Sequence, residues 1–166
     1  MPQDSIHQTQ QYRPAILLYR GHGLIDGLIK WQTRSEYSHA AILIPNGNII
    51  ESYPGVGVRL RKSQIAAGFD FRLQCPVDAF DVPEACARTW FNAIEYCRHE
   101  LGAKYDWKGI ARFITRLPGG DPNRWFCSEL VAAAFRAAGR PLLARIEPWA
   151  ISPELLSISP KLRIRP

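Results

Sequence analysis

Residues 38–52, SHAAILIPNGNIIES, decide the fold, because they contain two apolar runs joined by a turn. HAAILI (39–44) and IIESY (49–53) are rich in the aliphatic residues of buried strands. Between them, PNGN (45–48) contains Asn-Gly, one of the strongest short-range signals for a β-hairpin. The stretch therefore predicts two antiparallel strands joined by a tight turn.

Further strand-like runs flank this hairpin. AILLY (15–19) is a short apolar run, GVGVRL (55–60) continues the extended pattern, and FDFRLQCPV (69–77) alternates between apolar and polar residues. One early helix is expected over residues 24–31, where apolar side chains recur at helical spacing. The first half of the chain is therefore predicted to be mostly β.

The second half is predicted to be mostly helical. Helices are expected over residues 83–101, where Pro stands in the first turn, and over 107–117. WFCSELVAAAFRAAG (125–139) is an alanine-rich helix pattern that ends in Gly, and Ser152 is a candidate N-cap of a last short helix. Strands grouped before helices predict an α+β fold, with an antiparallel sheet packed against helices.

The composition is that of an ordinary globular domain. The 166 residues are 46% hydrophobic and 22% charged, and a chain of this size buries roughly 70% of its unfolded surface. The polar, Gln-rich residues 1–13 predict a flexible N-terminal tail, and residues 14–166 predict a single domain. The sequence has no apolar run of about 20 residues. Its start lacks the apolar core of a signal peptide, so we expect a cytoplasmic protein.

The charge and the cysteines narrow the range of partners. The net charge is +6, but no zinc-finger, RNA-binding or basic-zipper pattern accompanies it, so specific nucleic-acid binding is not expected. The four cysteines form no C-x-x-C pair, so no metal or other cofactor is predicted. Cys75, Cys86 and Cys97 are interpreted as small apolar core residues.

Cys127 has the position of a catalytic nucleophile. It stands at the start of the helix expected over 125–139, directly after a turn. Backbone N–H groups in a first helical turn are unpaired and partly positive, so they stabilise a thiolate. They can also bond the oxyanion that forms when a carbonyl is attacked. A buried cysteine packed on Trp125 and Leu130 is the alternative that position alone leaves open.

His39 and Glu51 are the candidate partners of this thiol. His39 alone among the four histidines starts an otherwise apolar strand, and an imidazole can take the thiol proton and return it. Glu51, unexpected in an apolar strand, would orient that imidazole. A two-residue turn would pair residue 44 with 49 and put His39 and Glu51 on opposite faces. The triad therefore requires a bulge, a different loop length or strong local twist.

These segments resemble the NlpC-type papain-fold cysteine peptidases. In that superfamily the nucleophile sits in a D-C-S-x-L-V-like helix start, which FCSELV (126–131) matches, and the base sits in an S-H-hydrophobic strand, which SHAAILI (38–44) matches. A polar third residue follows the histidine by twelve positions in the family, which is the spacing from His39 to Glu51. The resemblance covers residues 15–156, and its specific motifs are the histidine and cysteine segments.

The order of the two motifs is reversed relative to the usual NlpC enzymes, which place the cysteine first. The order here resembles the circularly permuted branch, which includes the YiiX-like bacterial proteins and the relatives of lecithin–retinol acyltransferase. The resemblance therefore implies a circularly permuted papain-like fold. It also implies a cysteine hydrolase that cleaves a peptide, cell-wall peptide or lipid amide.

The resemblance further assigns roles to the site residues. Cys127 would be the nucleophile, His39 the general base and acid, and Glu51 the orienting acceptor. Tyr105, in the KYD stretch at 104–106, is a candidate to bring its hydroxyl to the oxyanion or the substrate, and a packed tyrosine is the alternative.

Two other functions stay open. One is an acyltransferase or thioesterase acting on lipids, with the basic surface in peripheral contact with an anionic membrane. The acyltransferase relatives carry an N-C-E-H-type segment where this chain has F-C-S-E (126–129), so vitamin-A chemistry is not implied. The other is a catalytically silent binding module of the same fold.

Overall fold

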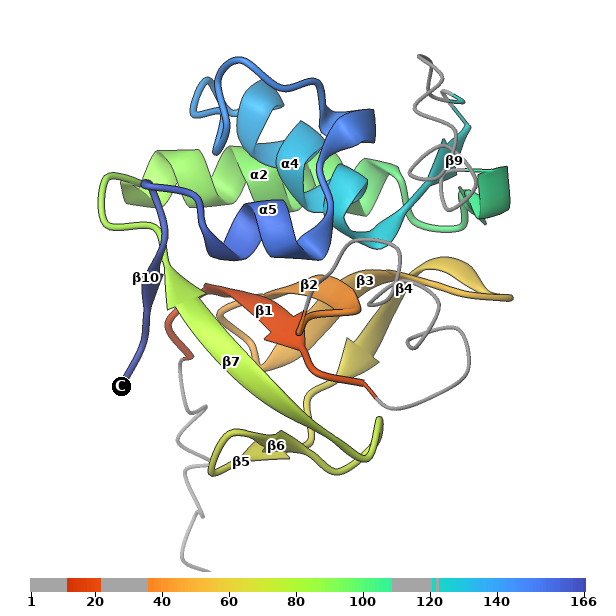
Figure 1. Cartoon of the computed structure of the whole chain (residues 1–166), viewed down its shortest axis with the longest axis vertical. Helices are drawn as coiled ribbons and strands as arrows, with labels where there is room; N and C mark the ends of the chain where they lie inside the picture. Colours follow the sequence, from red (N-terminus) through yellow and green to blue (C-terminus); the bar gives the residue numbers. More distant parts are fainter. Residues whose placement is uncertain (1–11, 22–35, 109–120, 122) are drawn as a thin grey trace, which may run out of the picture.

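The structure has two layers, a curled sheet of antiparallel strands and a group of helices over one of its faces (Figure 1). The computed structural model describes residues 12–21, 36–108, 121 and 123–166. The strands of the sheet are β1 (Ala15–Tyr19), β2 (His39–Leu43), β3 (Asn48–Tyr53), β4 (Gly57–Lys62), β5 (Ile65–Ala66), β6 (Phe69–Asp70), β7 (Cys75–Asp81) and β10 (Arg163–Ile164). Their order is β4-β3-β2-β1-β7-β6-β5, and β10 pairs with β7.

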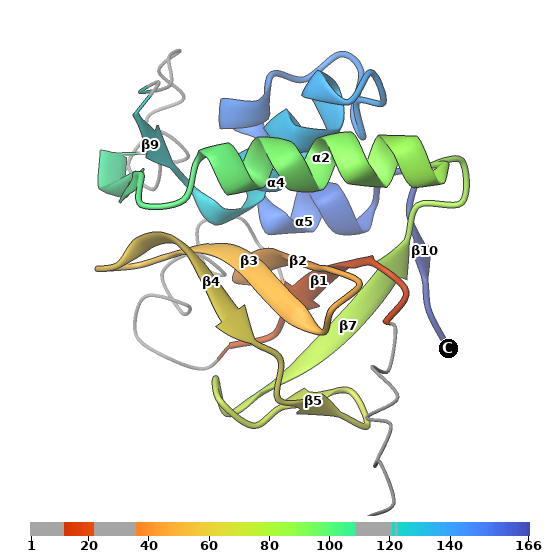
Figure 2. The ribbon, with the colours of Figure 1, turned by 180° about the vertical axis from the view of Figure 1, so that it is seen from behind.

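The helices lie mostly in the second half of the chain. Those among the described residues are α2 (Ala87–His99), α4 (Cys127–Ala137), the 3-10 helix η1 (Pro148–Ala150) and α5 (Pro153–Ser157). Two short strands, β8 (Lys104–Tyr105) and β9 (Arg124–Trp125), pair in parallel beside them. Seen from behind, α2 runs along the helical layer above the strands (Figure 2). The predicted α+β class is confirmed. Within the described ranges, no helix is both long and apolar enough to cross a membrane.

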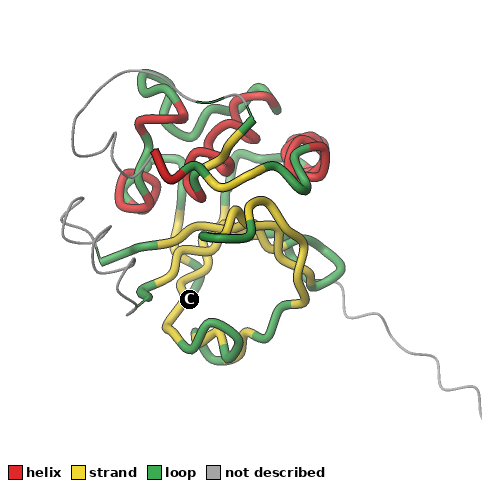
Figure 3. The backbone as a smooth tube through the Cα atoms, turned by 90° about the vertical axis from the view of Figure 1, so that its right-hand side faces the viewer, coloured by secondary structure: helices red, strands yellow, loops and turns green. Residues whose placement is uncertain are grey.

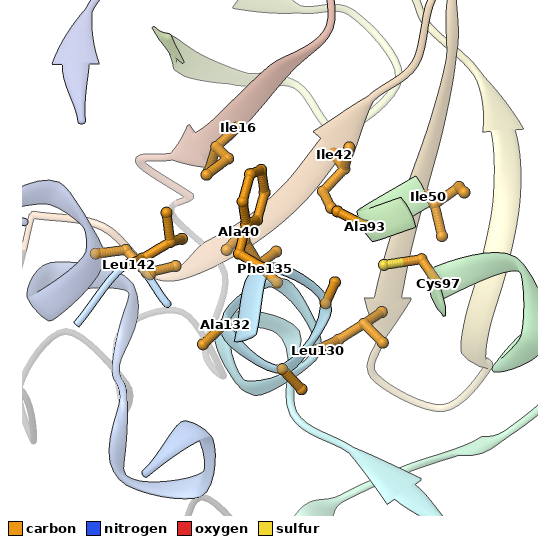
Figure 4. Close-up of a cluster of buried hydrophobic side chains, with 14 of the residues drawn as sticks. Ile16, Ala40, Ile42, Ile50, Ala93, Cys97, Leu130, Ala132, Phe135 and Leu142 are labelled. Carbon is orange, nitrogen blue, oxygen red and sulfur yellow. The ribbon is translucent and has the colours of Figure 1, made fainter. Parts of the chain in front are cut away.

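The central strands bury both of their faces. Even-numbered residues such as Ile16, Ala40 and Ile50 point toward the helices and pack with Leu130 and Phe135 (Figure 4). Odd-numbered residues of the same strands lie inside the curl, in a second cluster made of Ala15, Leu17, Tyr19, Ala41, Leu43, Ile49, Cys75 and Val77. Figure 3 shows how the strands curl around that inner side. Burial on both faces explains the uninterrupted apolar run of β1.

The β2–β3 hairpin has a longer loop than the simplest turn would give. Residue 43 pairs with 49, and the Ile44 N–H donates to the carbonyl of Asn48 at 2.9 Å. The loop is therefore the three residues 45–47, with Gly47 at φ 77, the pattern of a turn followed by a left-handed bulge residue. The pairing of residue 44 with 49 is wrong. The shift of one position puts His39 and Glu51 on the same face of the sheet.

Two expectations of local structure are also wrong. The segment over 69–77 is not one strand, because Gln74 adopts φ 56 and the chain folds into a hairpin of β6 and β7. The helix expected from residue 83 begins at Ala87, after a turn in which the Ala85 N–H donates to Val82. Cys86 therefore precedes the helix and is exposed, not a core residue, and its sulfur lies 3.4 Å from the Thr89 hydroxyl.

Other local predictions are confirmed. Ser152 caps α5 by accepting the Leu155 N–H at 3.2 Å, Gly139 follows α4 at φ 75, and Cys75 and Cys97 are buried. The helix expected over 24–31, most of the one over 107–117, and residues 1–11 of the predicted tail lie outside the described residues.

Candidate active site

Cys127 is the first residue of α4, and its side chain is buried (1% exposed). The preceding Phe126 has an extended backbone, and its N–H donates to the Glu129 carboxylate at 3.2 Å. A glutamate at the third helical position that reaches back in this way fixes where the helix begins. The thiol therefore lies at the N-terminal end of a helix, where unpaired N–H groups and the helix dipole favour negative charge.

The segment before Cys127 is anchored to the sheet and to α2. The Ser52 hydroxyl on β3 donates to the Trp125 carbonyl at 2.7 Å, and the Trp125 indole N–H donates to Glu100 at 2.7 Å. Within α4, the Ser128 hydroxyl donates to the Ile151 carbonyl at 2.6 Å. These bonds, two of them buried, fix the start of α4 against β3, the strand that also carries Glu51.

His39 and Glu51 meet on the inner face of the curled sheet. His39 pairs with Tyr19 across β1 and β2, and Glu51 pairs with Ala41, two positions further along β2. The imidazole Nε2 lies 2.9 Å from a Glu51 carboxylate oxygen. Tyr19 and Tyr53 flank the imidazole, with ring centroids 5.3 and 5.8 Å away. The rings and the carboxylate thus restrict how the imidazole can turn.

Cys127 and Glu51 together control the charge of His39. Burial lowers the pKa of the imidazole, but hydrogen bonds to the Cys127 thiol and to Glu51 outweigh burial and raise the pKa to about 10. Because Nε2 is engaged by Glu51, Nδ1 is the ring nitrogen left for the thiol. The structure therefore brings the three residues predicted from the sequence together, with His39 between the other two.

Glu51 is held by two arginines of β4 as well as by His39. Its second carboxylate oxygen accepts from Arg59 at 2.9 and 2.7 Å and from the Arg61 Nε at 2.9 Å. Burial alone would raise the pKa of this carboxyl, but the hydrogen bond and charge of His39, together with the two arginines, lower it to about 2. Glu51 is therefore an ionised carboxylate that is itself inaccessible to solvent.

The sequence reasoning missed a further part of this cluster. Another nitrogen of Arg61 donates to Asp70 at 2.6 Å and to the Tyr19 hydroxyl at 3.1 Å. The signal was present in GVRLRK (57–62), because Arg59 and Arg61 stand two residues apart and a strand puts such residues on one face. That this face of β4 meets Glu51 follows only from the pairing of β4 with β3, which no pattern in the sequence predicts.

Tyr105 lies beside the nucleophile. It is buried (3% exposed) in a cluster with Phe126 and Cys127, and its ring centroid is 5.9 Å from that of Phe126. Strand β8 is joined to β4 because the Val58 N–H donates to the Ala103 carbonyl at 2.8 Å. Gly57, at φ 92, lets this carbonyl approach where any β-carbon would collide. The fold thus brings Tyr105 near the thiol, and its part in binding stays a prediction.

No group of three or more His, Cys, Asp or Glu side chains that could hold a metal ion occurs among residues 12–21, 36–108, 121 and 123–166. Cys127, His39 and Glu51 form a linear series of contacts instead, and Glu51 carries arginine partners on its other oxygen. The chemistry that this arrangement supplies is that of an imidazole between a thiol and a carboxylate.

Comparison with solved structures finds a similar fold, and comparison with protein families and curated proteins finds no match. No protein-family model matches the chain, and no curated protein matches it. Among solved structures, the chain resembles the metalloprotein yiiX from Escherichia coli O157:H7, with a TM-score of 0.69 over 95% of this chain and 97% of that chain. The identity is 16%, so the likeness shows a yiiX-like fold alone.

Proposed function

We propose that the protein is a cysteine hydrolase that cleaves an amide through an acyl-enzyme on Cys127. The observation that carries the proposal is the position of His39, whose Nε2 lies 2.9 Å from Glu51 and whose imidazole interacts with the thiol of Cys127, the first residue of α4. A thiol, a base and an orienting acid in that order are the parts that nucleophilic catalysis by cysteine needs.

The chemistry follows from the roles of these groups. The Cys127 sulfur attacks the carbonyl carbon, and the carbonyl oxygen becomes an oxyanion that N–H groups at the start of α4 stabilise. The carbon–nitrogen bond then breaks, and His39 gives its proton to the leaving amine. Water, losing a proton to His39, attacks the thioester, which releases the acid and leaves the thiolate beside protonated His39. Glu51 holds the imidazolium in place, and Tyr105 lines the site next to the sulfur.

The order of the histidine and cysteine motifs and the fold together favour a permuted papain-like hydrolase. The chain has the fold of yiiX, and its histidine and cysteine segments resemble the NlpC-type papain-fold peptidases in permuted order. We therefore include the permuted papain-like fold in the proposal, with a relationship to the lecithin–retinol acyltransferase group. The substrate would be a peptide, cell-wall peptide or lipid amide, acted on in the cytoplasm.

A metal centre at this site fits the described residues poorly. The solved structure of similar fold is of a metalloprotein, but here the Glu51 carboxylate is bonded to two guanidinium groups and to His39. A cation beside Glu51 would lie against Arg59 and Arg61, and like charges at that distance repel. We therefore derive no step of the reaction through a metal.

The test is the pH dependence of Cys127 alkylation by iodoacetamide, in wild type and in His39→Ala, with mass spectrometry separating Cys127 from the other cysteines. We expect Cys127 in the wild type to react at pH values well below the ~8.5 at which a free thiol ionises. In His39→Ala the rise in rate moves toward that value, because the imidazolium that stabilises the thiolate is gone.

The shape of the curve decides the test, not the absolute rate, because a sulfur with 1% of its residue surface exposed reacts slowly at any pH. The exposed Cys86 in the same sample is the internal control, since it is distant in sequence from the triad and open to reagent. A Cys127 curve that is the same with and without His39 contradicts the proposal and favours a binding role.

A further inference from the structure

We propose that Arg61 is a positioning residue of this site, which holds the Glu51 carboxylate ionised against His39 and thereby sets how acidic the solution can become before Cys127 loses reactivity. The inference rests on the proposed function, since it concerns the same thiol and imidazole. It goes beyond the triad by assigning a task to a buried ion cluster that the reaction itself does not touch.

The geometry of Arg61 carries the inference. Its guanidinium is buried (side chain 3% exposed), as are the Glu51 and Asp70 carboxylates (both 0%). Nε donates to Glu51 at 2.9 Å while Nη2 donates to Asp70 at 2.6 Å, so one planar fork links two carboxylates. A buried arginine between two buried acids is costly to desolvate and is held in place only by good geometry. The position of the Glu51 carboxylate is therefore coupled to that of Asp70.

Asp70 is itself fixed by the backbone. Its other carboxylate oxygen accepts the N–H groups of Arg72 and Leu73, at 2.9 and 3.2 Å, in the turn between β6 and β7. The path from the turn to the imidazole is thus continuous, from backbone to Asp70, then to Arg61, Glu51 and His39. The steps from Asp70 to Arg61, Glu51 and His39 are hydrogen bonds between buried groups, so solvent screens them little.

The charges around Glu51 on the described elements are few and can be named. His39 faces it from β2, Arg59 and Arg61 from β4, Asp70 lies behind Arg61 on β6, and Tyr19 lies beside them on β1. On the far side of the imidazole is Cys127 at the start of α4. Arg59 is the more exposed of the two arginines, with 23% of its side chain accessible against 3% for Arg61. Arg61 should therefore have the larger influence on Glu51.

Loss of Arg61 should raise the pH at which Cys127 loses its reactivity. Without it, the buried Glu51 carboxylate takes up a proton at higher pH, because one nearby cation typically lowers a carboxyl pKa by about 1–3 units. Once Glu51 is neutral, the imidazolium loses the acceptor that holds it against the thiolate, and the thiolate takes up a proton at higher pH while the imidazole stays charged. The acid limb of the alkylation curve is the pH range in which the rate falls as the thiolate takes up a proton. Without Arg61 this limb therefore moves to higher pH.

The experiment compares the acid limb in wild type, Arg61→Met, Arg61→Lys and Asp70→Asn. We expect Arg61→Met to move the limb up by about one pH unit or more, which is a tenfold or larger loss of rate at a pH on the limb. Arg61→Lys should move it less in the same direction, because one ammonium nitrogen cannot serve both carboxylates as a guanidinium does. Asp70→Asn should leave the limb in place or lower it, since Arg61 then has only Glu51 to neutralise.

An Asp70→Asn limb that stays in place or moves down, while the Arg61→Met limb moves up, separates the effect of the Arg61 charge from loosened packing, which would move both limbs up. Arg136→Met is the matched control, because Arg136 also makes an ion pair, lies on α4 with Cys127, and bonds Glu147 and the Ile146 carbonyl away from the triad. Its limb should coincide with wild type.

Two negative results are distinguishable. A wild-type Cys127 that ionises like a free thiol contradicts the proposed function itself. A wild-type Cys127 with an acid-stable thiolate, together with a folded Arg61→Met whose limb coincides with it, overturns only the role of Arg61. If Arg61→Met does not fold, Arg61→Lys decides, and a limb at the wild-type position overturns the inference.

Discussion

The two faces of strands β2 and β3 differ in that charged side chains occur on only one of them. Toward the helices, Ala40, Ile42 and Ile50 enter a wholly apolar cluster (Figure 4). Toward the inside of the curl, Ala41, Leu43 and Ile49 join a second apolar cluster, and His39 and Glu51 enter a network of charges. Because side chains of a strand alternate, one short hairpin contributes to the core below the helices with its even residues and supplies the centre of the candidate site with its odd ones.

The two faces differ in how well each tolerates substitution of the side chains that its residues contact. An apolar contact tolerates another side chain of similar volume, whereas a buried charge without its partner costs several kcal/mol. On the charged face the two carboxylates of Glu51 and Asp70 are balanced by the guanidinium groups of Arg59 and Arg61. Substitutions on the apolar face should therefore change stability alone, and those on the charged face should change the pH response as well.

The largest effect is expected on the apolar face, from Phe135→Ala. Phe135 is fully buried on α4 and meets Trp90 edge-on, with ring centroids 5.0 Å apart. Removing its ring leaves a cavity and should lower the free energy of unfolding by about 3–5 kcal/mol, measured by urea denaturation. The acid limb of Cys127 alkylation should stay where it is in the folded variant. Phe91→Ala, on the exposed side of α2 (63% exposed), is the control and should change stability by no more than about 0.5 kcal/mol.

The next effect in size is acid destabilisation through Glu51. The pKa of Glu51 falls from an ordinary 4.5 to about 2 in the folded protein. A lowered pKa contributes stability that is complete above about pH 4.5 and is lost as the pH falls toward 2, on the order of 3 kcal/mol in all. Urea denaturation at a series of pH values measures this loss.

Glu51→Gln gives the corresponding contrast. The variant should be less stable at neutral pH, because Arg61 and Arg59 lose a charged acceptor. Its free energy of unfolding should fall less steeply between about pH 4.5 and pH 2 than that of the wild type. Glu84→Gln, which removes an exposed carboxylate paired with Arg140, should keep the wild-type slope. An unchanged slope in Glu51→Gln would show that Glu51 is not the group that titrates.

The sequence predicted features that depend on residues close together in the chain and did not predict those that depend on residues far apart in it. Strands β1, β2 and β3, the helix at Cys127 and the Ser152 cap depend on neighbours along the chain, and short patterns predicted them. The register of the β2–β3 hairpin depends on whether the loop has two or three residues, and Asn-Gly alone suggested the shorter one. The Arg61–Asp70–Glu51 cluster depends on the pairing of β3 with β4 and on the turn after β6, which no local pattern encodes.

The smallest effect concerns Ser52, which is adjacent to Glu51 on β3 and points to the opposite face. Its hydroxyl donates to the Trp125 carbonyl at 2.7 Å, two residues before Cys127, and so connects the strand of the charged face to the start of α4. Ser52→Ala should lower the free energy of unfolding by only about 1 kcal/mol, because the Asp106 N–H also donates to that carbonyl, at 3.1 Å.

The rate and the pH dependence of Cys127 alkylation should respond differently to Ser52→Ala. The change alters no charge near the imidazole, so the acid limb should stay at its wild-type pH. It loosens the attachment of the thiol to the sheet, so the rate on the plateau should change. Ser159→Ala removes a comparable buried bond, to the Leu142 carbonyl at 2.7 Å, far from the thiol in sequence, and should cost similar stability with no change in rate. A Ser52→Ala limb displaced as far as that of Arg61→Met would mean that the thiolate depends on the placement of α4 and not on the charge of Glu51.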